Sequence, residues 1–259
     1  MTWTREERAL SFGSIAEHYW RYRPAPPAEA VDWVIQGARP DSEGRTGVSR
    51  AVDLAAGTGA LTSTLAKRVS DVVAVEPDPG MREVFVRLLP GVPLVGALAE
   101  ALPFVSGRID ALTVSSAWHW MDPQRAPFEI SRVLRRGGVL GTIWNGVDRK
   151  VEWVDELFED GRERSFVEPQ SSHRHRFDLP EQAGLVDVEV NVVHWTKNLD
   201  LEQMVGLAGS YSRVFNLPED RRDAVLGRVA RLGRERLEEA GAVELSVPMR
   251  CACWRAVKS

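Results

Sequence analysis

The segment Val52–Thr62, VDLAAGTGALT, is the most informative part of this 259-residue chain. A short apolar run reaches an aspartate, passes two glycines separated by one residue, and enters a helix-forming sequence. This order is typical of a buried strand that turns tightly into a helix and brings its backbone close to a ligand. Glycine permits the turn and leaves room for a nucleoside cofactor, because it has no β-carbon.

Two classes of cofactor fit such a turn. Dinucleotide binding favours the spacing G-x-G-x-x-G, whose third glycine lets the helix pack closely on the strand. Gly57 and Gly59 match the first two positions, but Thr62 occupies the third. S-adenosylmethionine tolerates this difference, because it has no pyrophosphate to seat at the helix. Glu76, 19 positions after Gly57, is placed to accept hydrogen bonds from the ribose hydroxyls of either cofactor.

Predicted strands alternate with predicted helices around this turn. The strands are nearly continuous in Val, Ile, Leu and Ala, which indicates that helices cover both faces of the sheet. We therefore predict an α/β fold with a doubly wound, mostly parallel seven-stranded sheet. The predicted strands are 51–55, 72–76, 92–95, 109–115, 139–144, 186–195 and 243–257. The helices between the first five are predicted at 60–69, 80–88 and 125–135, the last closed by Gly137.

The remaining helices are predicted to form a cap over the sheet. They span 4–22 (with Thr4 and Glu7 in capping-box spacing), 28–36, 151–158, a segment from Asp200 with a second capping box to Gln203, and 218–240. The polar stretch 161–177 has no predicted structure. We expect a single domain whose core is about 48–145, 185–195 and 243–257, with a cap of 1–36, 146–184 and 196–242.

Composition argues against several other classes of protein. A net charge of −4 and a pI near 5.8 provide no basic surface for nucleic acid or an anionic membrane. No apolar run approaches the roughly 20 residues of a membrane-spanning helix, and the charged N-terminus is unlike a signal peptide. Cys251 and Cys253 are expected to be small buried residues rather than a disulfide or a metal site. We expect a cytoplasmic enzyme, a monomer or a homodimer, without a metal.

Several segments of the sequence, including the glycine turn, resemble those of a known protein family. They are VDLAAGTG at 52–59, VEPDPGM at 75–81, AEALPF at 99–104, AWHW at 117–120, RVLRRGG at 132–138, and the pattern Phe12, Tyr19, Tyr22-Arg23-Pro24. Together they make the chain similar to the class I S-adenosylmethionine-dependent methyltransferases. Within that class it resembles the small-molecule type 11 group, which includes trans-aconitate methyltransferase-like enzymes.

The resemblance implies where S-adenosylmethionine would bind and leave as S-adenosylhomocysteine. The methionine end would lie near Asp53 and the glycine turn, its carboxylate would meet Tyr19 or Arg23, and the ribose would meet Glu76. Leu98 stands where many relatives have an adenine-binding aspartate, so adenine would be held by a backbone group or by packing. The implied cofactor-binding residues are Tyr19, Arg23, Asp53, Ala55, Gly57, Thr58, Gly59, Glu76, Pro77, Met81, Ala99, Glu100, Ser115 and Ala117.

Methyl transfer from a sulfonium is an in-line displacement, so the protein mainly aligns the acceptor and excludes water. His119 is a candidate base or substrate-orienting residue, although it equally fits a packed histidine in an aromatic wall. The expected acceptor is a small molecule with a carboxylate or another oxygen nucleophile. An NAD(P)-dependent oxidoreductase and a catalytically silent S-adenosylmethionine-binding protein stay open as alternatives. The candidate acceptor-binding residues are Tyr22, Trp118, Trp120, Asn145 and Tyr211.

Overall fold

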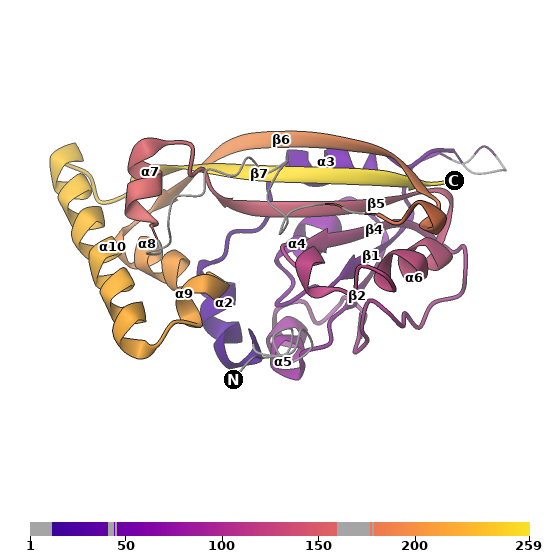
Figure 1. Cartoon of the computed structure of the whole chain (residues 1–259), viewed down its shortest axis with the longest axis horizontal. Helices are drawn as coiled ribbons and strands as arrows, with labels where there is room; N and C mark the ends of the chain where they lie inside the picture. Colours follow the sequence, from indigo (N-terminus) through magenta and orange to yellow (C-terminus); the bar gives the residue numbers. More distant parts are fainter. Residues whose placement is uncertain (1–11, 41–43, 45, 160–176, 178) are drawn as a thin grey trace.

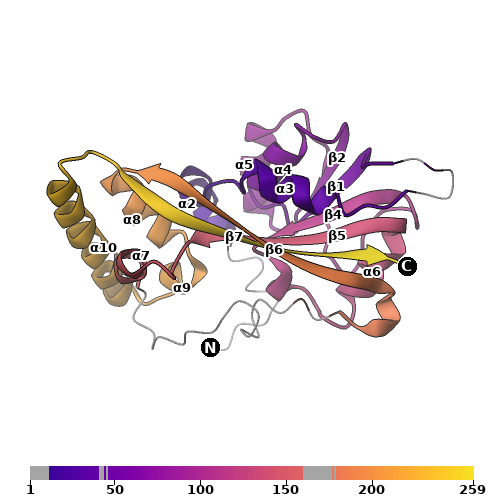
Figure 2. The same cartoon turned by 90° about the horizontal axis from the view of Figure 1, so that it is seen from above.

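A computed structural model of the chain describes residues 12–40, 44, 46–159, 177 and 179–259. In this part of the chain one seven-stranded sheet has the order β3-β2-β1-β4-β5-β7-β6 (Figures 1 and 2). Neighbouring strands from β3 to β5 are parallel, whereas β7 runs antiparallel to both β5 and β6. The predicted mostly parallel sheet is confirmed. The strands are β1 (Arg50–Leu54), β2 (Asp71–Val75), β3 (Leu94–Val95), β4 (Ile109–Ser115), β5 (Leu134–Val147), β6 (Leu185–Leu199) and β7 (Leu245–Lys258).

Helices connect and flank these strands. The α-helices are α2 (Ala16–Tyr22), α3 (Ala28–Ile35), α4 (Ala60–Leu65), α5 (Pro79–Leu88), α6 (Ala126–Val133), α7 (Glu152–Leu157), α8 (Leu201–Gly209), α9 (Ser212–Phe215) and α10 (Glu219–Ala240). Three short 3-10 helices are η1 (Phe12–Ile15), η2 (Trp118–Trp120) and η3 (Glu181–Ala183).

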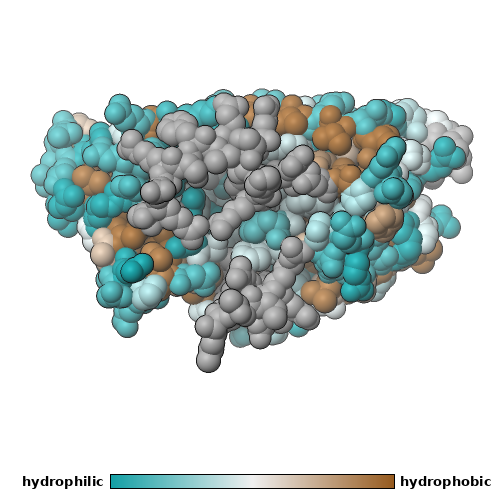
Figure 3. Space-filling model, viewed as in Figure 1, coloured by the Kyte–Doolittle hydropathy of each residue, from teal (hydrophilic) through white to brown (hydrophobic). Residues whose placement is uncertain are grey.

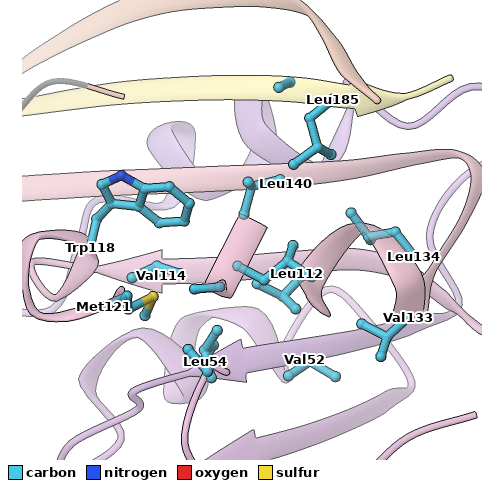
Figure 4. Close-up of a cluster of buried hydrophobic side chains, with 14 of the residues drawn as sticks. Val52, Leu54, Leu112, Val114, Trp118, Met121, Val133, Leu134, Leu140 and Leu185 are labelled. Carbon is cyan, nitrogen blue, oxygen red and sulfur yellow. The ribbon is translucent and has the colours of Figure 1, made fainter. Parts of the chain in front are cut away.

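The central strands bury side chains on both faces of the sheet. In β1, Ala51 packs with α3 and α4 on one face, whereas Val52 and Leu54 join the cluster on the other. Because side chains alternate along a strand, a strand covered on both sides needs apolar residues at successive positions. Figure 4 shows the second cluster, in which Leu112 and Leu140 from neighbouring strands meet α6.

The last three strands are much longer than the first ones. β5, β6 and β7 have 14, 15 and 14 residues, against five each in β1 and β2. At about 3.3 Å per residue they extend well beyond the parallel strands, and helices α7 to α10 gather around their far end (Figures 1 and 2). The surface around these helices is largely hydrophilic (Figure 3). In agreement, the 22-residue α10 buries only Val229 and Gly233.

Helix α2 packs on this end through a glycine. A β-carbon built on Gly206 in α8 would lie 2.3 Å from the ring of Tyr22, so only glycine admits the ring. His18 Nε2 lies 2.9 Å from the Gly206 carbonyl oxygen. Asp200 and Gln203 form the predicted capping box at the start of α8. The N-terminal segment is therefore built against a helix nearly 190 positions later in the chain.

One helix prediction is wrong at its C-terminal end. Helix α6 ends at Val133 rather than at residue 135, and Gly137 (φ 75°) lies inside β5 instead of capping a helix. Leu134 pairs with Ile109, and the register shifts before the next pair, between Ala111 and Val139. Glycine fits this irregular stretch because a left-handed φ strains other residues. Pairing with β4 thus ends the helix, a long-range effect that the local helical pattern does not contain.

Smaller differences concern the ends of elements. Helix α4 ends at Leu65 rather than at 69, and α9 was not predicted. β6 reaches residue 199 and β7 residue 258, so both run past the predicted core bounds. Helix α3, assigned to the cap by the sequence analysis, packs against the sheet. The N-terminal capping box and most of the stretch 161–177 lie outside the described residues.

The two cysteines are free and buried, as the sequence predicts, with their sulfur atoms 3.9 Å apart. They belong to the cluster between α3 and the sheet. The hydrogen bond with the Cys253 thiol and burial raise the pKa of Cys251, so this thiol stays protonated.

Gly141 lets α3 pack on the sheet and provides a test of this fold. A β-carbon there would lie 2.1 Å from Cγ1 of the fully buried Val34. We expect Gly141→Ala to lower the free energy of unfolding in urea by about 1–3 kcal/mol, because the packed core cannot accept the methyl group. Adding Val34→Ala should recover part of the loss. Gly91→Ala, where a β-carbon meets nothing within 4 Å, is the control; an unchanged Gly141→Ala protein would contradict this packing.

Candidate cofactor and acceptor site

The glycine turn after β1 depends on left-handed backbone conformations. Ala55, Gly57 and Gly59 have φ values of 54°, 58° and 93°. A β-carbon on Gly59 would lie 2.5 Å from Leu89 and 3.0 Å from Phe85, so glycine is also needed for α5 to approach. A β-carbon on Gly57 would meet nothing within 4 Å. The turn is therefore packed on one side and open on the other.

Two strand ends at the same edge hold non-glycine residues with left-handed φ. Ala55 directly follows β1, and Ser116 (φ 55°) directly follows β4. Each such residue costs about 1–3 kcal/mol, and such strain gathers at ligand sites. Ser115 and Ala117, both among the implied cofactor-binding residues, flank Ser116 and are half-buried.

Glu76 joins the two turns that follow β1 and β2. Its buried carboxylate accepts one backbone hydrogen bond on each oxygen, from Gly57 N (2.8 Å) and from Asp78 N (2.8 Å). Burial raises the pKa of Glu76 to about 7, against the opposing effect of these two donors. Each oxygen keeps a lone pair, so the carboxylate can fix both turns and still accept from a hydroxyl.

Asp53 is a fully buried carboxylate with one oxygen unused. Its Oδ2 accepts from Thr62 Oγ1 at 2.5 Å, whereas Oδ1 has no partner among the described residues. Burial raises the pKa of Asp53 to about 7, the Thr62 hydroxyl opposes this, and the charge of Glu76 adds to it. Thr62, which in the sequence only argued against a dinucleotide, thus holds the aspartate in place. A buried acceptor without a donor is costly unless a ligand supplies one.

Asp78 is a site-building residue that the sequence analysis missed. Its Oδ1 caps α5 by accepting from Gly80 N (2.8 Å) and Met81 N (3.1 Å), and its Oδ2 accepts from Gly13 N (3.0 Å). A β-carbon on Gly80 would lie 2.8 Å from the Cα of Gly13, so two glycines meet here. The sequence Asp-Pro-Gly after a strand was the available signal, because Asp followed by Pro is typical of a helix start.

Three predicted ligand residues meet around one guanidinium. The guanidinium of Arg23 lies 4.3 Å from the ring centroid of Tyr211 and 5.5 Å from that of Tyr19. Its Nη1 is buried and has no partner among the described residues. The hydroxyl of Tyr211 accepts from Val147 N at 3.4 Å. The stacked rings hold a cation with donor capacity to spare.

Tyr22 and Asn145 lie in places that do not match their predicted contact with the acceptor. The hydroxyl of Tyr22 donates to Glu202 Oε1 at 2.7 Å, which raises the pKa of this tyrosine, and its ring lines a groove of about 540 Å³ with residues of α8 and α10. Asn145 donates to the carbonyls of Pro24 (3.1 Å) and Ala25 (3.2 Å). Both side chains are used to pack the N-terminal segment.

The aromatic segment after β4 is divided between the core and the site. Trp118 is only 7% exposed and packs against Phe177 with ring centroids 5.2 Å apart, so it belongs to the core rather than to an acceptor pocket (Figure 4). His119 and Trp120 are half-buried, and their ring centroids are 4.4 Å apart with the planes tilted by 42°. These two remain the candidates for contact with an acceptor. Trp254 is buried in the same cluster as Trp118.

On the predicted adenine side, Ala99 is buried, and Glu100 Oε1 accepts from Asp122 N at 2.6 Å. Met81 is buried beside Ala16 of α2, so it packs the N-terminal segment. Two further implied cofactor residues, Pro77, which is half-buried, and Thr58, which is buried, adjoin the two turns.

Within the described ranges no group of three or more His, Cys, Asp or Glu side chains is placed to hold a metal ion. No helix in this part of the chain is long and apolar enough to cross a membrane.

The class I methyltransferase fold is defined by features that this chain combines. They are a sheet with one antiparallel strand between β5 and β6, a glycine turn after β1 and a buried acid after β2. A family model described as a methyltransferase domain matches residues 52–142. The chain is 38% identical over 257 residues to an uncharacterized methyltransferase of Mycobacterium tuberculosis, covering 99% of each.

Solved structures agree on the fold. A proposed type II methyltransferase from Anaeromyxobacter dehalogenans superposes with a TM-score of 0.65 at 22% identity, covering 92% of this chain and 98% of that one. The [4+2]-cyclase SpnF gives a TM-score of 0.55 at 16% identity, covering 99% and 97%. The chain belongs to the S-adenosylmethionine-dependent methyltransferases. This membership decides against the oxidoreductase alternative.

The two buried carboxylates predict how stability depends on pH. Because the pKa values of Asp53 and Glu76 are about 7 in the folded chain, it retains protons that the unfolded chain releases above about pH 4. The free energy of unfolding should therefore decrease as the pH rises from about 5 to 7, by on the order of 1 kcal/mol per pH unit and group, and level off above.

Urea unfolding of the ligand-free protein between pH 5 and 8 measures this slope. In Asp53→Asn the slope should be smaller, because one of the two titrating groups is gone. Equal slopes in both proteins would show that Asp53 is ionised throughout.

Proposed function

We propose that the protein transfers the methyl group of S-adenosylmethionine to the oxygen of a small-molecule acceptor, a carboxylate in the first instance. The main support is Asp53, a buried carboxylate fixed by Thr62 whose Oδ1 has no partner among the described residues. It lies at the strand end beside a glycine turn that is open on one side. A cationic amino group is the ligand chemistry that such an oxygen accepts best.

The other polar groups of the site fit the rest of the cofactor. Glu76 has lone pairs left for ribose hydroxyls, and the Nη1 donors of Arg23 suit the methionine carboxylate. The open side of Gly57 leaves space where a side chain would project. Adenine would lie beside Ala99 and Glu100, without the aspartate that Leu98 replaces.

The bound cofactor supplies a methyl group on a sulfonium, which is already reactive toward a nucleophile. The residues of this chain therefore need to orient the acceptor and keep water out. His119, packed against Trp120 past the end of β4, would take a proton from a hydroxyl acceptor or orient a carboxylate, which needs no base. Tyr211 and Trp120 complete the acceptor side. The acceptor is proposed from the trans-aconitate-type resemblance, since the fold does not fix the chemistry.

Calorimetry tests the cofactor assignment. We expect S-adenosylmethionine to bind in the micromolar range and NAD to give no heat of binding. Asp53→Asn should lower the affinity for S-adenosylmethionine by about 10- to 100-fold, which corresponds to the loss of one charged hydrogen bond. The control is Asp71→Asn, since Asp71 pairs with Arg50 at the exposed start of β2. Equal affinities of both variants would remove Asp53 from the site.

Replacing His119 by alanine tests the base. If His119 removes a proton, turnover with a hydroxyl acceptor falls by about 10²- to 10⁴-fold, while the affinity for S-adenosylhomocysteine stays within twofold. Release of S-adenosylhomocysteine across a panel of small carboxylates and phenols gives the rate. His194→Ala, at an exposed histidine on β6, is the control. Unchanged turnover of His119→Ala would leave it a packing residue.

A further inference from the structure

The side chain of Asn145 joins three segments that are distant in the sequence. From the C-terminal part of β5, its Nδ2 donates to the carbonyl oxygens of Pro24 (3.1 Å) and Ala25 (3.2 Å), and its Oδ1 accepts from Trp195 Nε1 (3.1 Å). An indole N–H can only donate. It therefore fixes which end of the amide is the oxygen, and both amide hydrogens must face the N-terminal segment.

The segment that Asn145 binds can form few backbone hydrogen bonds of its own. Prolines at 24, 26 and 27 lack the backbone N–H, so residues 24–27 cannot continue α2 or join a strand ladder. Helix α2 ends at Tyr22, and Arg23 is already extended, with φ −81° and ψ 117°. The Pro27 carbonyl accepts from Ala30 N at the start of α3 (3.1 Å), whereas the carbonyls of Pro24 and Ala25 accept from Asn145.

The residue before this segment carries a guanidinium whose Nη1 has no hydrogen-bond partner among the described residues. Arg23 directly precedes Pro24, and its guanidinium stacks on Tyr211 at 4.3 Å. Tyr211 is itself bonded to the backbone N–H of Val147, two residues after Asn145. The end of β5 thus binds the backbone directly after Arg23 and also the tyrosine on which its guanidinium stacks.

We propose that Asn145 is a positioning residue, which holds the backbone at 24–25 so that the Arg23 guanidinium meets the carboxylate of S-adenosylmethionine. The inference rests on the proposed function, which assigns that carboxylate to Arg23. This positioning role replaces the predicted contact of Asn145 with the acceptor, since the amide nitrogen already donates to two carbonyl oxygens within the chain. Because Asn145 acts through Arg23, replacing Asn145 should lower the affinity only for ligands that have the carboxylate.

Asn145→Asp tests the proposal, because it keeps the shape and the acceptor oxygen but removes both donors. Calorimetry compares S-adenosylmethionine with its decarboxylated form, which lacks only the carboxylate. We expect Asn145→Asp to lower the affinity for S-adenosylmethionine about tenfold and the affinity for the decarboxylated form less than twofold. In an Arg23→Met background, Asn145→Asp should have no further effect on either ligand. The control is Asn198→Ala, an exposed asparagine on β6.

The milder variant Trp195→Phe removes only the donor that orients the amide, and it provides the same comparison if Asn145→Asp does not fold. It should show a smaller loss in the same pattern. An equal loss for both ligands, or a loss that persists in the Arg23→Met background, would overturn the positioning role. Failure of the wild-type protein to bind S-adenosylmethionine at all would overturn the proposed function and this inference with it.

Discussion

The carboxylate of Glu76 fastens together two turns that would otherwise be independent. It accepts a backbone hydrogen bond from Gly57 after β1 and another from Asp78 after β2. Because the strands are parallel and adjacent, their carboxyl ends meet at one edge, and this bridge turns the edge into a fixed surface. The glycine turn, the start of α5 and the open space beside Gly57 all depend on it.

From this edge, side-chain contacts lead to the N-terminal segment. Asp78 caps α5 and also accepts from Gly13, while Met81 on the same helix packs on Ala16. At the other end of the segment, Asn145 holds the proline-rich stretch after α2. The residues proposed to close over the cofactor are therefore anchored at both ends of their segment, on two different parts of the sheet.

The site combines features that cost stability. Asp53 and Glu76 are buried with raised pKa values, and Ala55 and Ser116 hold a left-handed backbone at neighbouring strand ends. Backbone strain and unpaired buried oxygens persist only where the surrounding structure holds these residues in place. In this protein the apolar cores packed on both faces of the sheet hold them. A cationic ligand would relieve part of the cost, so the same features that burden the free protein favour binding.

Local periodicity and the backbone freedom of glycine set the order of strands and helices, the glycine turn, the acid after β2 and the buried cysteines, so these could be predicted from the sequence. The sequence also carried the family. Three features became visible only in the folded chain: α6 ends where β4 pairs with Leu134, Thr62 holds Asp53, and Trp118 lies in the core. The tertiary structure also moved Tyr22 and Asn145 from the acceptor to the packing of the N-terminal segment. Each of these depends on partners far along the chain, and local sequence patterns do not contain the partner.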